Sequence, residues 1–454
     1  MLNIEKIEKK YDLSGLKYKE FYLWPFLRGV YGPYTLNQNR GIKVPKKKNL
    51  FSKIINVKAY KIYFFGVFNI FRQYNYIIFS DTDSLKPVGN KIYDRMAHGV
   101  MEFLDVNSFL YVKDFNSNMS FNYKKCIYKS ISNHFFILLS RLTFLFVKKI
   151  PSKIDILDSI NLEYDISIDY EYEINKFLSL YYTYKTLFKI KKPKVVFVTC
   201  FTKRSVVKAA NDLNIPTIEF QHGVISKNYA YNLPMGCDYS CHPKYLLVYG
   251  ESEKKIFEKY NYLKNNNNIY VIPNFYVNKI SNLKIDLGIP SSYKYKVVVS
   301  LQNPVQKEMV DFINNVSKRL PNFFFILVPR LTKTLSDFKL SHNVNKYEEH
   351  NFYEIANQCD LHVTAYSTCA LEAPVFGLPN IFVNIKGLSK YYYSDFIFDK
   401  SYNFLVNNEL EFVNLMNDFK FEEKDFIKLA HKDYYSQDQY LLNRFIKILR
   451  KEIK

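Results

Sequence analysis

Residues 192–223, KPKVVFVTCFTKRSVVKAANDLNIPTIEFQHG, decide the fold class of this chain. The part up to Cys200 is a continuous apolar run with the length of one buried strand. Residues 204–214 then carry apolar positions at helical spacing, and a second apolar run ends abruptly at Gln221-His222-Gly223. A strand, a helix and a second strand in this order predict two parallel strands joined by a right-handed crossover.

The same alternation recurs along the chain. In the first half it predicts a strand at 74–80 and a strand running into a helix at 245–261, while 100–190 reads as mostly helical and aromatic-rich. In the second half it predicts a strand at 296–302, a helix at 305–320, a helix capped by Asn351 and Glu354, and a strand at 360–367. The prediction is therefore an α/β protein with two open parallel sheets, one in residues 1–285 and one in 286–454. The facing carboxyl ends of the strands would form the binding cleft.

Composition suggests the kind of partner. Lysine and arginine number 64 against 43 acidic residues, a formal net charge of +21. This surplus fits an anionic membrane surface, a phosphate-bearing substrate or nucleic acid, and it also fits a genome rich in lysine codons. The six cysteines lack the density of a disulfide framework, so reduced cytoplasmic thiols are expected. Cys237, Cys241 and His242 are close enough in sequence to raise a zinc site as a weaker alternative, and no metal is expected.

The sequence predicts a cytoplasmic protein that is either soluble or peripheral to the membrane. The first 15 residues contain no apolar segment of the kind found in signal peptides. The most apolar stretch, residues 134–147, is shorter than the roughly 20 residues of a membrane-spanning helix and contains Arg141. It is expected to form a buried helix, or one lying on a membrane surface with Lys148 and Lys149 near the headgroups.

A candidate phosphate site lies in VTAYSTCALEAPVFGLPNIFV, residues 363–383. The strand delivers Ser367 and Thr368 to the first turn of a helix, where free N–H groups and the helix dipole attract anions. Glu372 follows one turn later on the same face, and its carboxylate would accept hydrogen bonds from sugar hydroxyls. The simpler alternative is a helix cap followed by a solvated glutamate.

A candidate catalytic base stands at the end of another strand. His222 has the side chain best suited to proton transfer near neutral pH, and Gly223 would let substrate approach the backbone. Asp81, Asp83 and Asp94 follow the strand at 74–80 and are rival bases, of which Asp81 is taken with His222 as catalytic. A structural histidine and solvated turn carboxylates are the alternatives.

Taken together, these motifs resemble the GT-B glycosyltransferases. S-T-x-x-x-E-A-x-x-x-G-x-P-x-I is similar to their donor-nucleotide region, and Q-H-G followed by aromatic residues is similar to bacterial capsule and surface-polysaccharide transferases. The resemblance implies two Rossmann-like domains, with His222 as base, Ser367 and Thr368 at the donor phosphates and Glu372 at the ribose or sugar. Where many relatives carry His-Pro, this chain has Pro329 and Arg330, so Arg330 would clamp a diphosphate.

The resemblance implies transfer of a sugar from a nucleotide-activated donor to a growing capsular or cell-surface polysaccharide, the acceptor being a polysaccharide or a lipid-linked chain. Gln302, after the first strand of the second domain, would also touch the donor. No cofactor beyond this co-substrate is expected. The alternatives are a CDP-polyol phosphotransferase of the teichoic-acid type, an epimerase of the same architecture, and a non-catalytic nucleic-acid-binding protein suggested by charge alone.

Overall fold

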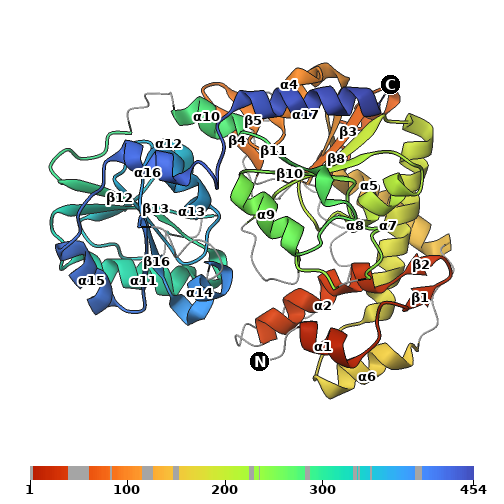
Figure 1. Ribbon diagram of the computed structural model, residues 1–454, viewed down its shortest axis with the longest axis horizontal. Helices are drawn as coiled ribbons and strands as arrows, with labels where there is room; N and C mark the ends of the chain where they lie inside the picture. Colours follow the sequence, from red (N-terminus) through yellow and green to blue (C-terminus); the bar gives the residue numbers. More distant parts are fainter. Residues whose placement is uncertain are drawn as a thin grey trace.

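The chain folds into two α/β lobes that lie side by side (Figure 1). The computed structural model describes residues 4–38, 61–81, 84–114, 126–146, 153–223, 230–234, 236–281, 287–330, 335, 338–347, 350–393 and 401–453. Asp83 and the expected domain boundary between residues 285 and 286 lie outside these ranges.

The first lobe contains a sheet of seven parallel strands in the order β11-β10-β9-β8-β3-β6-β7. The strands are β3 (Tyr76–Ser80), β6 (Phe109–Lys113), β7 (Ser130–Ser132), β8 (Val195–Val198), β9 (Thr217–Phe220), β10 (Tyr245–Val248) and β11 (Ile269–Val271). The order of connection reverses between the neighbours β3 and β8, and this is where open α/β sheets bind ligands, beyond the carboxyl ends of their strands.

The second lobe repeats the plan with six parallel strands in the order β14-β13-β12-β15-β16-β17. The strands are β12 (Tyr295–Ser300), β13 (Phe323–Val328), β14 (Val344–Lys346), β15 (Leu361–Thr364), β16 (Asn380–Val383) and β17 (Asn403–Val406). Its reversal lies between β12 and β15. The predicted pair of open parallel sheets is confirmed, and each has the strand order of a Rossmann-like domain.

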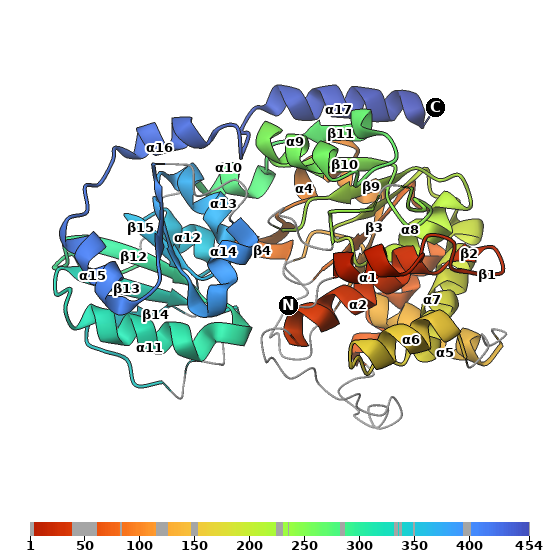
Figure 2. The same cartoon turned by 60° about the horizontal axis from the view of Figure 1, so that its bottom comes forward.

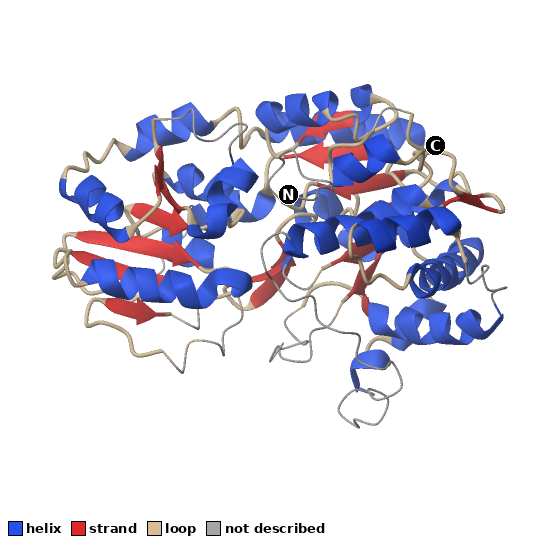
Figure 3. Ribbon diagram, turned by 90° about the horizontal axis from the view of Figure 1, so that it is seen from below, coloured by secondary structure: helices blue, strands red, loops and turns tan. Residues whose placement is uncertain are grey.

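Helices lie on both faces of each sheet (Figure 3). In the first lobe they are α1 (Ile4–Lys10), α2 (Trp24–Gln38), α4 (His98–Phe103), α5 (Asn133–Phe146), α6 (Asp155–Glu163), α7 (Tyr170–Lys191), α8 (Arg204–Asn211), α9 (Glu251–Lys259) and α10 (Phe275–Ser281). In the remainder they are α11 (Gln306–Ser317), α12 (Phe352–Ala356), α13 (Cys369–Glu372), α14 (Leu388–Tyr393), α15 (Glu409–Asn417), α16 (Lys424–His431) and α17 (Gln439–Glu452). None of the described helices is both long enough and apolar enough to cross a bilayer.

Local sequence patterns correctly predicted where some of these helices begin and end. Asn351 and Glu354 form the expected capping box at the start of α12. Gly377 ends the short helical segment after α13 with φ +79°, a conformation that favours glycine. The expectation that residues 100–190 are mostly helical was wrong for β6 and β7, because strands buried on both faces give short apolar runs that resemble buried helix.

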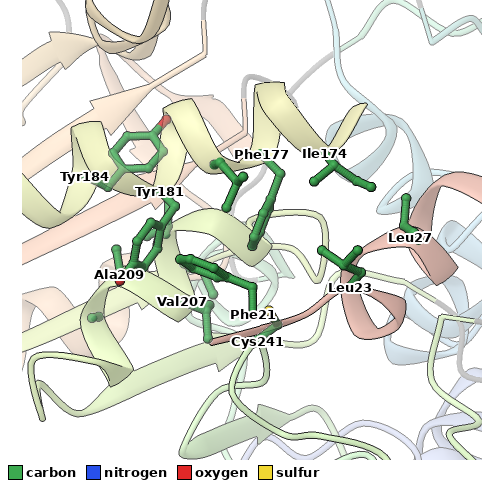
Figure 4. Close-up of a cluster of buried hydrophobic side chains, with 14 of the residues drawn as sticks. Phe21, Leu23, Leu27, Ile174, Phe177, Tyr181, Tyr184, Val207, Ala209 and Cys241 are labelled. Carbon is green, nitrogen blue, oxygen red and sulfur yellow. The ribbon is translucent and has the colours of Figure 1, made fainter. Parts of the chain in front are cut away.

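One core of the first lobe is built where α2 and α8 pack near the long helix α7. Phe21, Leu23 and Leu27 precede or begin α2 and lie beside Phe177 and Tyr181 of α7 (Figure 4). Cys241, from the segment before β10, closes the same cluster. These contacts fix the N-terminal helices against the body of the domain.

The chain does not end in the second lobe. After α16 it returns, and α17 lies along the first lobe (Figure 2). Leu442 and Phe445 of α17 share a buried cluster with Tyr76 and Ile78 of β3, so residues 439–452 pack with the first sheet although the expected division assigns them to the second domain. The returning segment passes so close to Gly250 that a Cβ there would lie 2.4 Å from the carbonyl oxygen of Asp433.

Candidate active site at the facing sheet edges

Three side chains meet at the carboxyl edge of the first sheet. Asp81 follows β3, Cys200 lies just beyond β8, and His222 follows β9. One ligand-type atom of each lies within 4.8 Å of the other two. The structure therefore brings together Asp81 and His222, which are far apart in sequence, at the reversal point of the strand order.

Lys203, to which no sequence motif pointed, pairs with acidic residues from two strand ends at this edge. The Lys203 ammonium lies 3.0 Å from Asp81 Oδ1 and also pairs with Asp114, the residue after β6. Burial alone would lower the pKa of Lys203, but the charges of Asp114 and Asp81 outweigh burial and raise it. Burial would raise the pKa of Asp114, and Lys203 reverses this and lowers it. Both groups of the Asp114–Lys203 pair are therefore charged near neutral pH.

Without a bound cation, the thiol of Cys200 is protonated near neutral pH. Burial, and then the charge of Asp81, raise the pKa of its thiol to about 12. A cation bound here would have to displace the proton of Cys200 and compete with Lys203 for Asp81. Over the described ranges no other set of three such groups meets these distances, so Cys237, Cys241 and His242 do not form the alternative zinc site.

The turn that carries His222 is held by the residue before it. Gln221 is fully buried; its amide oxygen accepts from the N–H of Tyr249 at 3.1 Å, and its amide nitrogen donates to the Gly223 carbonyl at 3.0 Å. These two bonds fix the backbone on both sides of His222. The Q-H-G sequence is thus a rigid strand end, which a site for proton transfer requires.

The rival carboxylate Asp94 has a structural role. It is fully buried and accepts hydrogen bonds from the hydroxyls of Ser80 and Tyr111, both at 2.6 Å. It also accepts from the backbone N–H groups of Met96 and Ala97, both at 2.9 Å. With its oxygens occupied in this way, Asp94 is not placed to serve as a base.

The second sheet presents its own edge to this cluster. Ser300, Val328 and Thr364 are aligned across β12, β13 and β15. Gln302, Arg330 and Ser367 follow them by two, two and three residues, so all three lie at the carboxyl edge beside the reversal point. Arg330 is exposed and Gln302 is half-buried.

Ser367 and Thr368 stand at the start of α13. Ser367 is buried, and its Oγ accepts from the N–H of Cys369 at 3.2 Å. Thr368 lies opposite the Q-H-G turn, because a Cβ built on Gly223 would be 3.8 Å from Thr368 Cγ2. The imidazole-bearing turn and the hydroxyl-bearing helix start therefore lie close together across the two domains, with room for about one methyl group between Gly223 and Thr368.

Glu372 makes an ion pair between the domains. Its Oε1 lies 2.6 Å from Arg95 Nη1 of the first domain and accepts from the Tyr353 hydroxyl at 2.9 Å. Burial would lower the pKa of Arg95, but Tyr353 and Glu372 outweigh it and raise that pKa. With 2% of Glu372 exposed, its role at a ribose hydroxyl stays a prediction that requires this carboxylate to be shared or released.

The sequence only weakly indicated that Arg95 and Lys203 belong to the site. Each follows a short apolar run and stands beside acids or small polar residues at a strand end. Their partners lie on other strands and, for Arg95, in the other domain, 277 residues away. Such pairings could not be assigned from local pattern.

The arrangement of two facing parallel sheets defines a class, the GT-B fold.

No protein-family model matches the chain, and no curated protein matches it. Among solved structures it is similar to a putative UDP-N-acetylglucosamine 2-epimerase from Listeria monocytogenes (TM-score 0.52, 11% identity, 84% of this chain and 97% of that one). It is also similar to CalG4, the calicheamicin glycosyltransferase (TM-score 0.52, 10%, 84% and 99%), and to the UDP-GlcNAc 2-epimerase from Neisseria meningitidis bound to UDP-GlcNAc (TM-score 0.50, 13%, 83% and 99%). At these identities the likeness shows the fold alone.

Proposed function

We propose that this protein is a glycosyltransferase that moves a sugar from a nucleotide-activated donor to a capsular or cell-surface polysaccharide. The observation that carries the proposal is the meeting of His222 and Asp81 on one sheet edge with Thr368 close by on the other. Solved proteins of this fold include a glycosyltransferase and an epimerase bound to UDP-GlcNAc. This supports a nucleotide sugar as co-substrate.

In the proposed reaction His222 takes the proton of an acceptor hydroxyl as that oxygen attacks the donor sugar. Asp81, held by Lys203, would stabilise the imidazolium that forms. The bond between the sugar and the nucleotide breaks, and the phosphate charge left on the nucleotide is stabilised by the hydroxyls of Ser367 and Thr368, with Arg330 supplying a cation. Gln302 would contact the donor from the neighbouring strand end. No metal enters this scheme, because Lys203 already supplies the cation beside Asp81.

The enzyme is further proposed to work at the inner face of the cell membrane. Leu142, Leu145 and Phe146 stand on one face of α5 with 56%, 75% and 86% of their surface exposed. In the sequence Lys148 and Lys149 follow, outside the described residues. An apolar helix face next to lysines, in a chain of net charge +21, suits anionic lipid.

The test begins with binding and ends with product analysis. UDP-, GDP-, CDP- and CMP-linked donors are screened by thermal shift, because a ligand bound at 100 times its Kd stabilises the fold by about 2.7 kcal/mol. With the donor that binds, His222→Ala should lose about 10²–10⁴-fold in turnover. The matched control, His342→Ala, changes an exposed histidine of the second domain and should keep wild-type turnover.

The products separate the alternatives. A glycosyl bond to the acceptor with release of the nucleotide supports the proposal. Transfer of a polyol phosphate with release of CMP would identify the teichoic-acid type of phosphotransferase. Conversion of the nucleotide sugar without any acceptor would identify an epimerase. If His222→Ala keeps turnover within threefold of wild type, His222 is not the catalytic base. Salt-dependent nucleic-acid binding with no donor turnover would favour the non-catalytic alternative.

A further inference from the structure

The two oxygens of the Glu372 carboxylate are in different situations. Arg95 Nη1 of the first domain and the Tyr353 hydroxyl of the second both donate to Oε1, at 2.6 and 2.9 Å. Among the residues that the structure describes, none donates to the other oxygen, Oε2, and this oxygen is not sealed from solvent. Oε1 thus holds the side chain in place, while Oε2 keeps its capacity to accept hydrogen bonds.

Arg95 is fixed on the first-domain side of this contact. It follows the hairpin of β4 (Leu85–Val88) and β5 (Lys91–Asp94), which lies where the two lobes meet (Figure 2). Its backbone N–H donates to the Ser84 carbonyl at 2.8 Å, and its side chain is 9% exposed. A guanidinium has a planar, rigid set of donors, so Arg95 reaches Glu372 in a defined orientation.

Tyrosine rings enclose the ion pair. Tyr249 of the first domain and Tyr435 of the returning segment stack at a centroid distance of 5.0 Å. Burial raises the pKa of both hydroxyls, so both are neutral, and the charge of Arg95 opposes this rise because the guanidinium lies near them. The carboxylate of Glu372 therefore balances the charge of Arg95 inside a neutral aromatic surrounding.

Glu372 lies one helical turn beyond the proposed phosphate contacts. Four residues of α-helix separate it from Thr368, a rise of about 6 Å. The ribose of a nucleotide is joined directly to its first phosphate, so this step along the helix matches the step from phosphate to ribose. Carboxylates serve as acceptors for ribose hydroxyls in other nucleotide sites of Rossmann-like domains. The open oxygen of Glu372 is therefore placed for the ribose.

We infer that Arg95 and Tyr353 are positioning residues for recognition of the donor's ribose. They hold Oε1 of Glu372 so that Oε2 accepts hydrogen bonds from the 2′- and 3′-hydroxyls. The donor nucleotide accordingly carries an intact ribose, and the deoxyribose of a deoxythymidine diphosphate sugar is disfavoured. Because Arg95 belongs to the first domain, this contact is complete only in the domain arrangement that the structure shows. The inference rests on the proposed transfer from a nucleotide sugar.

The competing way to bind a ribose is to release Glu372 from Arg95. Release would leave a buried guanidinium without its partner, and two neutral hydroxyls do not replace a carboxylate charge. Sharing keeps the ion pair intact and uses the oxygen that it leaves open. The two mechanisms predict effects of opposite sign, because removal of Arg95 weakens nucleotide binding if the carboxylate is shared and tightens it if the carboxylate must be released.

Nucleotide binding without any acceptor tests the inference. Isothermal titration calorimetry of the intact protein gives the Kd of UDP, GDP, CDP and CMP, each beside its 2′-deoxy counterpart. The readout is the ribose preference, defined as the Kd of the deoxynucleotide divided by that of the ribonucleotide. A purely structural defect weakens both nucleotides alike and leaves this preference unchanged. For the wild type we expect a preference of about tenfold or more, as for a hydrogen bond to a charged group.

The variants should change this preference in a graded way. Arg95→Met should reduce it to about threefold or less, and Arg95→Lys, which keeps the charge but loses the planar fork, should lie between. Tyr353→Phe removes a single hydroxyl and should cause a smaller reduction; it also serves if Arg95→Met does not fold. The matched control is Arg28→Met, because Arg28 and Glu8 form a buried pair with the same 2.6 Å separation, away from the facing edges. It should leave the preference unchanged.

Several outcomes would overturn the inference. One is a wild-type preference near one, and another is an undiminished preference in Arg95→Met and Tyr353→Phe. Tighter binding of the ribonucleotide by Arg95→Met would show that Glu372 must be released. Equal loss of preference in Arg28→Met would show a general effect of instability. In each of these cases the protein still binds a nucleotide, whereas binding of none of them would refute the proposed function and this inference with it.

Discussion

The ion pair between Arg95 and Glu372 should contribute strongly to the stability of the two-domain arrangement. Their side chains are 9% and 2% exposed, so removal of one partner leaves a buried charge without compensation. Such a loss costs about 3–5 kcal/mol. Arg95→Met is the sharpest perturbation, because methionine keeps much of the side-chain length but removes both the charge and the N–H donors that bind Glu372.

The expected shift in melting temperature follows from the size of the chain. An unfolding entropy of about 2.1 cal/mol/K per residue gives about 1 kcal/mol/K for 454 residues that unfold as one unit. Arg95→Met should therefore lower Tm by about 3–5 °C, and by more if one domain unfolds first. Differential scanning calorimetry at low and at high salt measures this, and the shift should persist at high salt because a buried pair is little screened.

Two further variants make the measurement specific. Glu372→Gln preserves an oxygen for the Tyr353 hydroxyl, and combined with Arg95→Met it should recover most of the lost stability, because neither charge is then left unpaired. Lys386 and Glu308 form a surface pair at the same separation, 2.6 Å, with side chains 43% and 42% exposed. Lys386→Met should therefore cost at most about 1 kcal/mol. A shift below 1 °C in Arg95→Met, or a double variant as unstable as the sum of the singles, would refute the reasoning.

Three other changes have definite expected outcomes. The double variant Ser367→Ala/Thr368→Ala should reduce the thermal shift produced by the nucleotide sugar, measured by fluorimetry. The reason is that two hydroxyl groups that would donate hydrogen bonds to the phosphate oxygens are lost. Burial raises the pKa of Glu219 to about 7 from an ordinary 4.5. Between these values the carboxyl is protonated when folded and ionised when unfolded, so the free energy of unfolding should fall by about 3 kcal/mol as pH rises through this window. Glu219→Gln should remove that fall in denaturant titrations. Leu145→Gln with Phe146→Gln should weaken co-sedimentation with vesicles that contain phosphatidylglycerol, because exposed apolar area is lost.

Two of these changes have a matched control variant, and each of the three has a result that would contradict it. For the nucleotide site the control is Ser341→Ala, which changes a serine just before β14, at the amino edge of the same parallel sheet. An unchanged response in the Ser367/Thr368 double variant would show that the phosphates bind elsewhere. For Glu219, a variant that keeps the wild-type pH dependence would mean that another group titrates. For the membrane, Leu429→Gln removes a leucine of α16 that is 65% exposed, and equal loss in both variants would contradict a specific role for α5.

The sequence by itself determined which segments form strands and helices and where their polar ends fall. Apolar runs and helical spacing are local properties, so β8, α8, β9 and the capping box of α12 could be predicted from neighbouring residues alone. Local sequence patterns also predicted that His222, Ser367 and Thr368 lie at strand ends. Prediction from local patterns failed for β6 and β7, because their short apolar runs do not distinguish strand from helix.

Only the tertiary structure decided which strand ends share an edge. Strand order follows from how whole layers pack, and no local pattern encodes that β3, β8 and β9 are neighbours, although this order is what joins Asp81 to His222. Helical spacing correctly put Glu372 one turn beyond Thr368, but its partner, Arg95, is supplied by the other domain. The return of α17 to the first sheet depends in the same way on contacts between segments far apart in sequence. A local pattern sets what a segment can become, whereas burial against distant segments sets which side chains meet.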